Sequence, residues 1–172
     1  MPTRDRRPGL AREPVAVAAL DLLDEVGLDR LSVRALATRL GVRSPALYWH
    51  FRDKAELLDL MAQQLQRPDV HESAVPGQGW REWLAEGARR RRRALLSRRD
   101  GARLVLGTRP GPQIARRAEA DLAVLVEQGF TATGGLRLLL AVGHYVTGFV
   151  LEEQAGQARE LPAGPPPDLP HT

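Results

Sequence analysis

The chain has 172 residues, with 25 lysines and arginines against 21 aspartates and glutamates, a formal net charge of +4, and no cysteine. A sequence without cysteine excludes a disulfide framework, a thiolate metal site and a cysteine nucleophile, and is typical of a protein of the reducing cytoplasm. The basic start, residues 1–11, is not followed by an apolar segment with a cleavage site, and no run approaches membrane-spanning length. We therefore expect a soluble, cytoplasmic protein with a flexible basic arm and no membrane partner.

The first predicted helix covers about residues 12–26 and ends at Gly27. Its apolar residues recur at helical spacing and therefore form one stripe, which we expect to pack against the helices that follow. The members of this stripe are Val15, Ala18, Ala19, Leu22, Leu23 and Val26.

Residues 31–42 are predicted to form a short helix and a tight turn. The Ser32 hydroxyl can accept hydrogen bonds from the exposed amides of the first turn. Gly41 suits the position just past the helix, because glycine takes left-handed backbone angles without a Cβ penalty, and Val42 can then tuck beneath the turn. The apolar face of this helix contains Val33, Leu36, Ala37 and Leu40.

A second, very short helix is expected to follow at once. Ser44 and Pro45 fit its N-cap and first position, since proline has no amide to leave unsatisfied there. We expect it to run as far as His50, with Leu47 and Phe51 supplying the core contacts. The side chains left free to point outward are Tyr48, Trp49 and His50.

A third helix is predicted to begin at Asp53, because Asp53 and Glu56 have the spacing of a capping box. Lys54 then lies at a helix amino terminus, where backbone amides favour a phosphate.

Two helices, a tight turn and adjacent exposed aromatic residues indicate a helix-turn-helix DNA-binding domain. The alternative, a small helical domain with a few exposed aromatic residues, explains this combination less well. The mild net charge adds little, because the placement of cations on phosphates matters more than their number.

The rest of the chain is also expected to be helical, so the predicted fold is all-α. The predicted helices are about 80–99, 113–128 and 133–157, with a turn region at 107–112. The predicted division is a basic arm (1–11), a helix-turn-helix domain with a connecting helix (12–67), a linker (68–79), a helical core (80–158) and a proline-rich tail (159–172).

Arg91 is expected to point into this core. It shares a helical stripe with apolar residues, and an inward arginine needs a partner. One alternative is an acidic effector held by Arg91 in a pocket widened at Gly87. The other is an internal ion pair with Asp121 or Glu152. An enzyme is the least favoured class, because no nucleophile, base and orienting residue occur at a recognisable spacing.

Four segments of the chain together resemble the TetR family, and its tetracycline-responsive branch in particular. They are ALYWHFRDKAELLD (46–59), RALLSRRDGARLVLGTRP (93–110), EQGF (127–130) and HYVTGFVLEEQ (144–154). The resemblance implies a double-stranded DNA operator as partner. The matching DNA-contact positions are Arg34, Ser44, Pro45, Ala46, Tyr48, Trp49, His50 and Lys54. Because the branch has glutamine and threonine where this chain has Ser44 and Ala46, we expect a different operator sequence.

The resemblance also implies that the core binds a small-molecule effector. His71, Thr108, His144 and Glu152 match pocket or metal-shell positions of the branch, where the ligand is a drug chelated to magnesium. Gly87, Arg91 and Asp121 replace pocket residues, and Val105 replaces the direct metal-ligand histidine. A valine cannot coordinate a metal, so we expect neither a bound metal nor another cofactor. The candidate effector-binding residues are His71, Gly87, Arg91, Thr108, Asp121, His144 and Glu152.

The function that the resemblance implies is a repressor that binds a palindromic operator as a homodimer and is released by its effector. The family's last dimerisation helix has no counterpart in the sequence, so a reduced dimer interface is expected. The alternative is a truncated, non-sensing family member that forms heterodimers with a full-length regulator.

Overall fold

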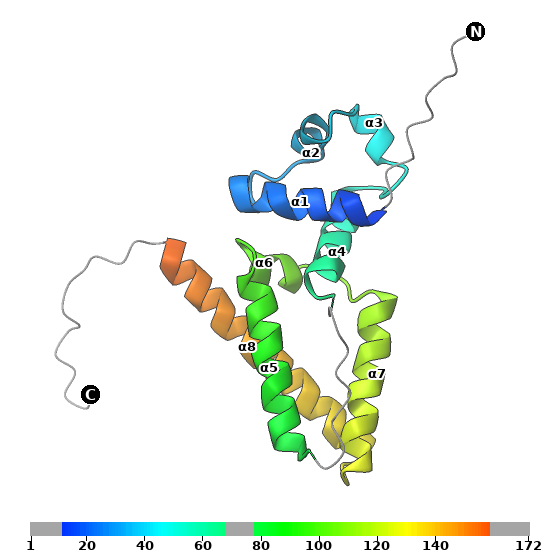
Figure 1. Ribbon diagram of the computed structural model, residues 1–172, viewed down its shortest axis with the longest axis vertical. Coiled ribbons are helices and arrows are strands. Elements are labelled where there is room, and N and C mark those ends of the chain that lie inside the picture. The colour runs from blue at the N-terminus through cyan, green and yellow to red at the C-terminus, as the bar shows by residue number, and fades with distance from the viewer. Residues whose placement is uncertain (1–11, 68–77, 159–172) are drawn as a thin grey trace, which may run out of the picture.

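The computed structural model describes residues 12–67 and 78–158, and every regular element in those two ranges is an α-helix. This confirms the all-α prediction. The helices are α1 (Arg12–Val26), α2 (Val33–Arg39), α3 (Ser44–Leu47), α4 (Lys54–Leu65), α5 (Trp80–Leu96), α6 (Gly101–Leu106), α7 (Pro112–Glu127) and α8 (Ala132–Ala158). Figure 1 shows α1 to α3 gathered at one end, which we call the head together with α4, and α5 to α8 forming the body below it.

The head is built around leucine side chains. Helix α1 packs against α2 and α4, and α2 packs against α3. Leu23, Leu36, Leu47 and Leu57 are fully buried, and Phe51 is 1% exposed. Burying each such side chain contributes about 1.5–3 kcal/mol, so these few contacts hold three short helices that would not persist alone.

The body is arranged around α8, against which α5, α6 and α7 all pack. Its inward side is lined by Val146, Thr147 and Val150. Within the described helices, α8 alone is long and apolar enough to cross a membrane by length and composition, which corrects the expectation that no run approaches that length. Because the central helix of a helical core has the same length and composition, this is weak evidence for a membrane segment.

The break between α5 and α6 was not predicted. Helix α5 ends at Leu96 instead of near residue 99, and α6 covers a segment to which the sequence assigned no helix. Asp100 takes left-handed angles there, with φ of +56°. A Cβ at Gly101 would lie 2.2 Å from the Leu95 carbonyl oxygen, so only glycine allows the chain to turn this closely.

This turn also joins the body to the head. The Arg98 guanidinium donates to carboxylate oxygens of Asp21 and Asp24 on α1, each at 2.7 Å. Just past the end of α1, the Leu28 amide donates to Asp100 Oδ2 at 2.8 Å. Charge-assisted bonds of this kind fix orientation, so the end of α1 is held firmly against the α5–α6 turn.

Candidate DNA-binding surface and effector pocket

The turn between α2 and α3 follows the sequence prediction closely. Ser32 Oγ accepts from the Ala35 amide at 3.2 Å, which caps α2. At the other end the Val42 amide donates to the Ala37 carbonyl at 3.0 Å and Gly41 has φ of +65°. This is the Schellman arrangement, in which the left-handed glycine allows the next residue to close the helix end.

Helix α3 is shorter than predicted and begins differently. Its N-cap is Arg43, not Ser44, so Ser44 and Pro45 are its first two residues. Proline fits either of these positions because both lack an intrahelical amide bond. The helix ends at Leu47, and Tyr48, Trp49 and His50 lie in turns instead of continuing it.

The turn after α3 carries the aromatic residues on its outside. Tyr48 is 51% exposed and Trp49 is 87% exposed, while Leu47 and Phe51 on either side are buried. His50 is half-buried. A tryptophan held in the open by two buried neighbours contributes little to the core, so its position favours contact with a partner.

Helix α4 begins with one half of the predicted capping box, because the Glu56 side chain reaches the amide of Arg52 and not that of the N-cap residue Asp53. Asp53 Oδ1 accepts from the Glu56 amide at 2.8 Å, and Glu56 Oε2 accepts from the Arg52 amide at 2.8 Å. The Arg52 backbone amide, together with its side chain, lowers the pKa of Glu56. Lys54 is the first residue of the helix and is exposed. An exposed cation at a rigid, capped amino terminus is well placed to contact a phosphate.

The structure adds two basic side chains that the sequence reasoning missed at this surface. Arg43 is exposed directly before α3, and the Arg52 side chain is 88% exposed directly before α4. Arg34, which was predicted, is exposed near the start of α2. The signal available in the sequence was their place next to helix starts, where a cation lies beside free amides.

Arg91 points into the body, as predicted, but it has neither of the carboxylate partners that the sequence suggested. Its Nη2 and Nε donate to Thr147 Oγ1 at 3.0 and 3.3 Å, and its Nη1 donates to Gln66 Oε1 at 3.1 Å. Across residues 12–67 and 78–158, no carboxylate pairs with it. Burial lowers the pKa of Arg91. The predicted ion pair of Arg91 with Asp121 or Glu152 is therefore wrong. Asp121 Oδ2 instead lies 3.5 Å from Nε of Arg117, on the same helix.

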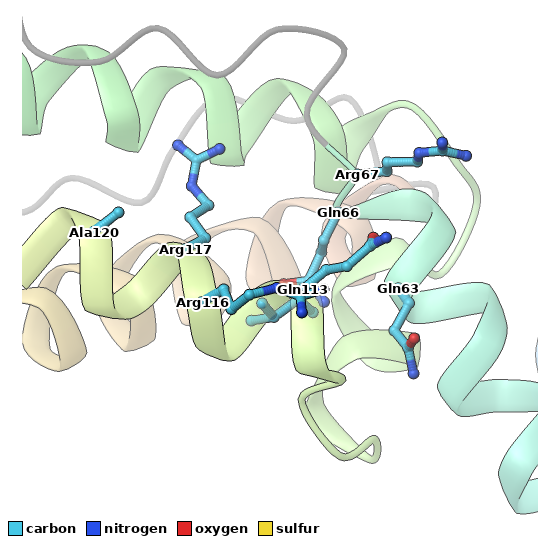
Figure 2. Close-up of a pocket in the computed structure, with 8 residues that line it drawn as sticks. Gln63, Gln66, Arg67, Gln113, Arg116, Arg117 and Ala120 are labelled. Carbon is cyan, nitrogen blue, oxygen red and sulfur yellow. The ribbon is translucent and has the colours of Figure 1, made fainter.

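A hollow of about 400 Å³ lies between the end of α4 and α7. Figure 2 shows Gln113 and Arg116 of α7 near Gln66, while the Arg117 side chain extends from α7 in a different direction. The sequence reasoning missed this set because its members come from the end of α4 and from α7, which are far apart in the sequence. The lining residues are Gln63, Gln66, Arg67, Gln113, Ile114, Arg116, Arg117 and Ala120.

The predicted effector residues are not all brought together. Gly87 faces open space, because a Cβ there would meet only the Arg90 guanidinium, at 3.8 Å. Thr108 Oγ1 donates locally to the Val105 carbonyl at 2.9 Å. His144 and Glu152 are exposed on α8, and Glu152 lines a separate hollow. His71 lies outside the described residues, and within the described ones no three potential metal ligands form a group.

Comparison with known proteins agrees with both halves of this description. The family model for bacterial regulatory proteins of the tetR family matches residues 16–61, and the model for the tetracyclin repressor-like C-terminal domain matches residues 74–163. The tetracycline repressor protein class A from transposon 1721 of Escherichia coli is 49% identical over 82% of this chain. The match covers 66% of that repressor, so the chain spans about two thirds of its length.

Two solved structures are similar over most of the chain. TetR (class A) in complex with 5a,6-anhydrotetracycline and magnesium has 46% identity and a TM-score of 0.74, covering 84% of this chain and 82% of that one. BioQ with its double-stranded DNA operator has 33% identity and a TM-score of 0.68, covering 85% and 88%. The fold, the exposed turn after α3 and both family models agree, and the chain belongs to the tetR family of bacterial regulatory proteins.

Proposed function

We propose that this chain is a cytoplasmic transcriptional repressor, not an enzyme, that binds a palindromic operator as a homodimer and is released by a small-molecule effector. Residues 12–67 bind DNA, and residues 80–158 bind the effector and dimerise. The observation that carries this proposal is the exposed Tyr48–Trp49 turn beside the capped, lysine-bearing start of α4. The operator complex of BioQ, a protein of similar fold, supports it.

In this account α3 enters the major groove with Ser44, Pro45 and Ala46 leading, and these short side chains set the register of the contact. Tyr48, Trp49, His50 and Lys54 contact the sugar–phosphate backbone, and Arg34 reaches a base edge or a phosphate. Backbone contacts of this kind position the protein without reading sequence. Sequence preference therefore depends on Arg34 and on the fit of α3.

The homodimer forms through the outward face of α8. Leu136, Leu140, Tyr145 and Phe149 are each more than two fifths exposed, and the Tyr145 and Phe149 rings are stacked with centroids 6.3 Å apart. A Cβ at Gly143 or Gly148 would meet nothing within 4 Å, so a partner backbone could approach there. A twofold dimer would present two α3 helices to successive major grooves, about 34–36 Å apart.

Helix α4 couples the two activities. Lys54 begins it beside the DNA-binding turn, while Gln63 and Gln66 at its other end line the hollow. A ligand in the hollow therefore touches the same helix that carries a DNA contact. If the ligand favours a different position of α4, DNA and ligand weaken each other's binding by the same factor.

The effector is not expected to be the magnesium-chelated drug of the tetracycline branch. Val105 stands where that branch has its metal-ligand histidine, and it is half-buried. The aliphatic side chain offers no lone pair to a metal. Titration of the protein with tetracycline and magnesium should therefore give no binding at micromolar concentrations.

Selection of bound DNA from a random pool, followed by sequencing, tests the proposal directly. The expected product is an inverted repeat that the protein binds specifically. Small molecules are then screened for release of the selected site. Failure to enrich any sequence would contradict the proposed function.

A further inference from the structure

The hollow between α4 and α7 is lined by several basic side chains. Of the eight lining residues that the structure describes, three are arginines, three are glutamines, and none is acidic. Arg67 pairs with Glu13 on α1, and Arg117 lies 3.5 Å from Asp121, so two of these guanidinium groups are partly neutralised from outside the lining. Arg116 is exposed. Guanidinium groups with amide neighbours match the geometry of a carboxylate or sulfonate.

A fourth arginine lies directly behind this lining. Gln66 Oε1 accepts from Arg91 Nη1 at 3.1 Å, while Gln66 Nε2 donates to the Ala62 carbonyl at 3.2 Å. Gln66 therefore stands between the hollow and a half-buried cation whose other partner, Thr147, is also neutral. A half-buried arginine that has no carboxylate partner among the described residues is costly, and an anionic ligand would supply the missing charge.

The face of α5 one turn before Arg91 carries no side chain at Gly87. Gly87 precedes Arg91 by one helical turn, and among the described residues a Cβ there would meet only the tip of Arg90. Trp83, one turn earlier, is 7% exposed and places this stripe of α5 on the inward side. The hollow itself is lined in part by the apolar side chains of Ile114 and Ala120, which can contact an apolar portion of the ligand.

We infer that the effector is an organic anion, an apolar molecule with a carboxylate or sulfonate group that Arg116, Arg117 and Arg91 bind. This rests on the proposed function, because it assigns a chemical class to the effector of the same pocket. The anionic group competes with Gln66 Oε1 for Arg91. Since Gln66 is the C-cap residue of α4, breaking the Arg91–Gln66 bond removes a tie between that end of the helix and α5.

Two fluorescent probes separate charge from apolar binding. Anilinonaphthalene sulfonate carries the anionic group, and phenylnaphthylamine has the same rings without it. The dissociation constant of each is measured with the wild-type chain, Arg91→Met and Arg116→Met. Arg89→Met is the matched control, since Arg89 is exposed on the same helix and pairs with Glu86 at 3.4 Å. Circular dichroism melting confirms that each variant is folded.

The sulfonate is expected to bind at least about tenfold more tightly than the neutral probe, and each of Arg91→Met and Arg116→Met should remove most of that difference. Arg89→Met should leave it unchanged. Ala120→Trp, which fills the hollow, should weaken both probes and so locate them. If Arg91→Met does not fold, the loss of sulfonate binding in Arg116→Met alone tests the inference. Replacing Arg116 should not affect folding, because its side chain is exposed.

Equal affinity for the two probes, or equal losses for both in the arginine variants, would overturn the inference while leaving an effector pocket in place. If neither probe binds, the inference and the pocket both fail. Operator binding without any probe, measured separately, tests the DNA-binding part of the proposed function by itself.

Discussion

The head and the body of this protein are both built from α-helices, but they differ in how completely their side chains are packed. In the head, the apolar side chains are sealed around Leu36, Leu47 and Phe51, and the side chains assigned to DNA stand outside this core. The body keeps a cation half-buried among neutral partners and an exposed apolar face on α8, and a hollow of about 400 Å³ lies where it meets the end of α4. The apolar core of the head is closed, whereas the body has surfaces that a ligand or a second copy of the chain would cover.

This difference has a thermodynamic consequence. A fully packed domain loses several kcal/mol when one buried side chain is truncated. A domain with unsatisfied surfaces gains stability from whatever binds its folded state. Substitutions in the head and in the body therefore separate these two behaviours.

Phe51→Ala should remove a fully buried ring from the head and lower the free energy of unfolding by about 3–5 kcal/mol. Tyr48→Ala is the matched control, because the neighbouring ring is 51% exposed and its centroid lies 6.0 Å from that of Phe51. Denaturant unfolding followed by circular dichroism measures both. Similar losses for the two variants would show that the head is not packed as described.

Trp49→Ala should leave stability unchanged and weaken operator binding on the order of 100-fold, about tenfold for each half-site of a dimer. The side chain is 87% exposed, so its removal opens no cavity. Val126→Ala, an exposed apolar change on α7, is the control. Fluorescence anisotropy with a labelled operator gives the affinity; an unchanged value would remove Trp49 from the DNA-binding surface.

Arg91→Leu should raise the free energy of unfolding by about 1 kcal/mol or leave it unchanged. The substitution replaces a half-buried charge, which has no carboxylate partner among the described residues, by an apolar group. Thr147 Oγ1 keeps its bond to the Gly143 carbonyl at 2.8 Å. Leu95→Ala, which opens a cavity on the same helix, should lower stability in the same assay. A loss of about 2 kcal/mol or more for Arg91→Leu would assign Arg91 a structural role.

Asp53→Ala should cost about 1 kcal/mol, the usual value of a helix N-cap, because it removes the acceptor for the Glu56 amide. Asp53→Asn keeps an oxygen acceptor and should recover most of the loss. Equal losses for the two substitutions would mean that the cap contributes through its charge instead of through the hydrogen bond.

Glu56 should give the smallest effect, and that effect depends on pH. Its pKa in the folded protein lies below the ordinary value of 4.5, chiefly because the Arg52 amide donates to the charged form. A depressed folded pKa stabilises the protein above the unfolded pKa, and this stabilisation is lost as pH falls through the folded pKa. Glu56→Gln should thus be less stable than wild type at neutral pH, with the difference vanishing in acid. A constant difference across the pH range would contradict this.

Local signals in the sequence predicted most of the head. Ser32, Gly41 and Asp53 each act on neighbouring backbone, so their effect can be derived from chain order. The end of α3 could not, because Tyr48 keeps helical angles, with φ of −69° and ψ of −5°, after the hydrogen-bond pattern has stopped. No residue type marks that end.

The missed features of the body depend on contacts between distant residues. Asp100 takes left-handed angles in a turn where its carboxylate accepts from the Leu28 amide, 72 positions away. The sequence correctly predicted that Arg91 points inward, but not that its partners would be Gln66 and Thr147, on two other helices. Neutral side chains carry no charge pattern that would identify them as partners of an arginine.

The most direct test of the whole account is the spacing of the two half-sites in the selected operator. Inserting about 5 base pairs between them turns one half-site to the opposite side of the duplex, so a rigid twofold dimer can no longer contact both. We expect the affinity to fall to that of an isolated half-site. Insertion of about 10 base pairs, in contrast, should return the two half-sites to the same side of the duplex. Equal affinity for the original and the half-turn operators would contradict a symmetric dimer that reads DNA with the two α3 surfaces.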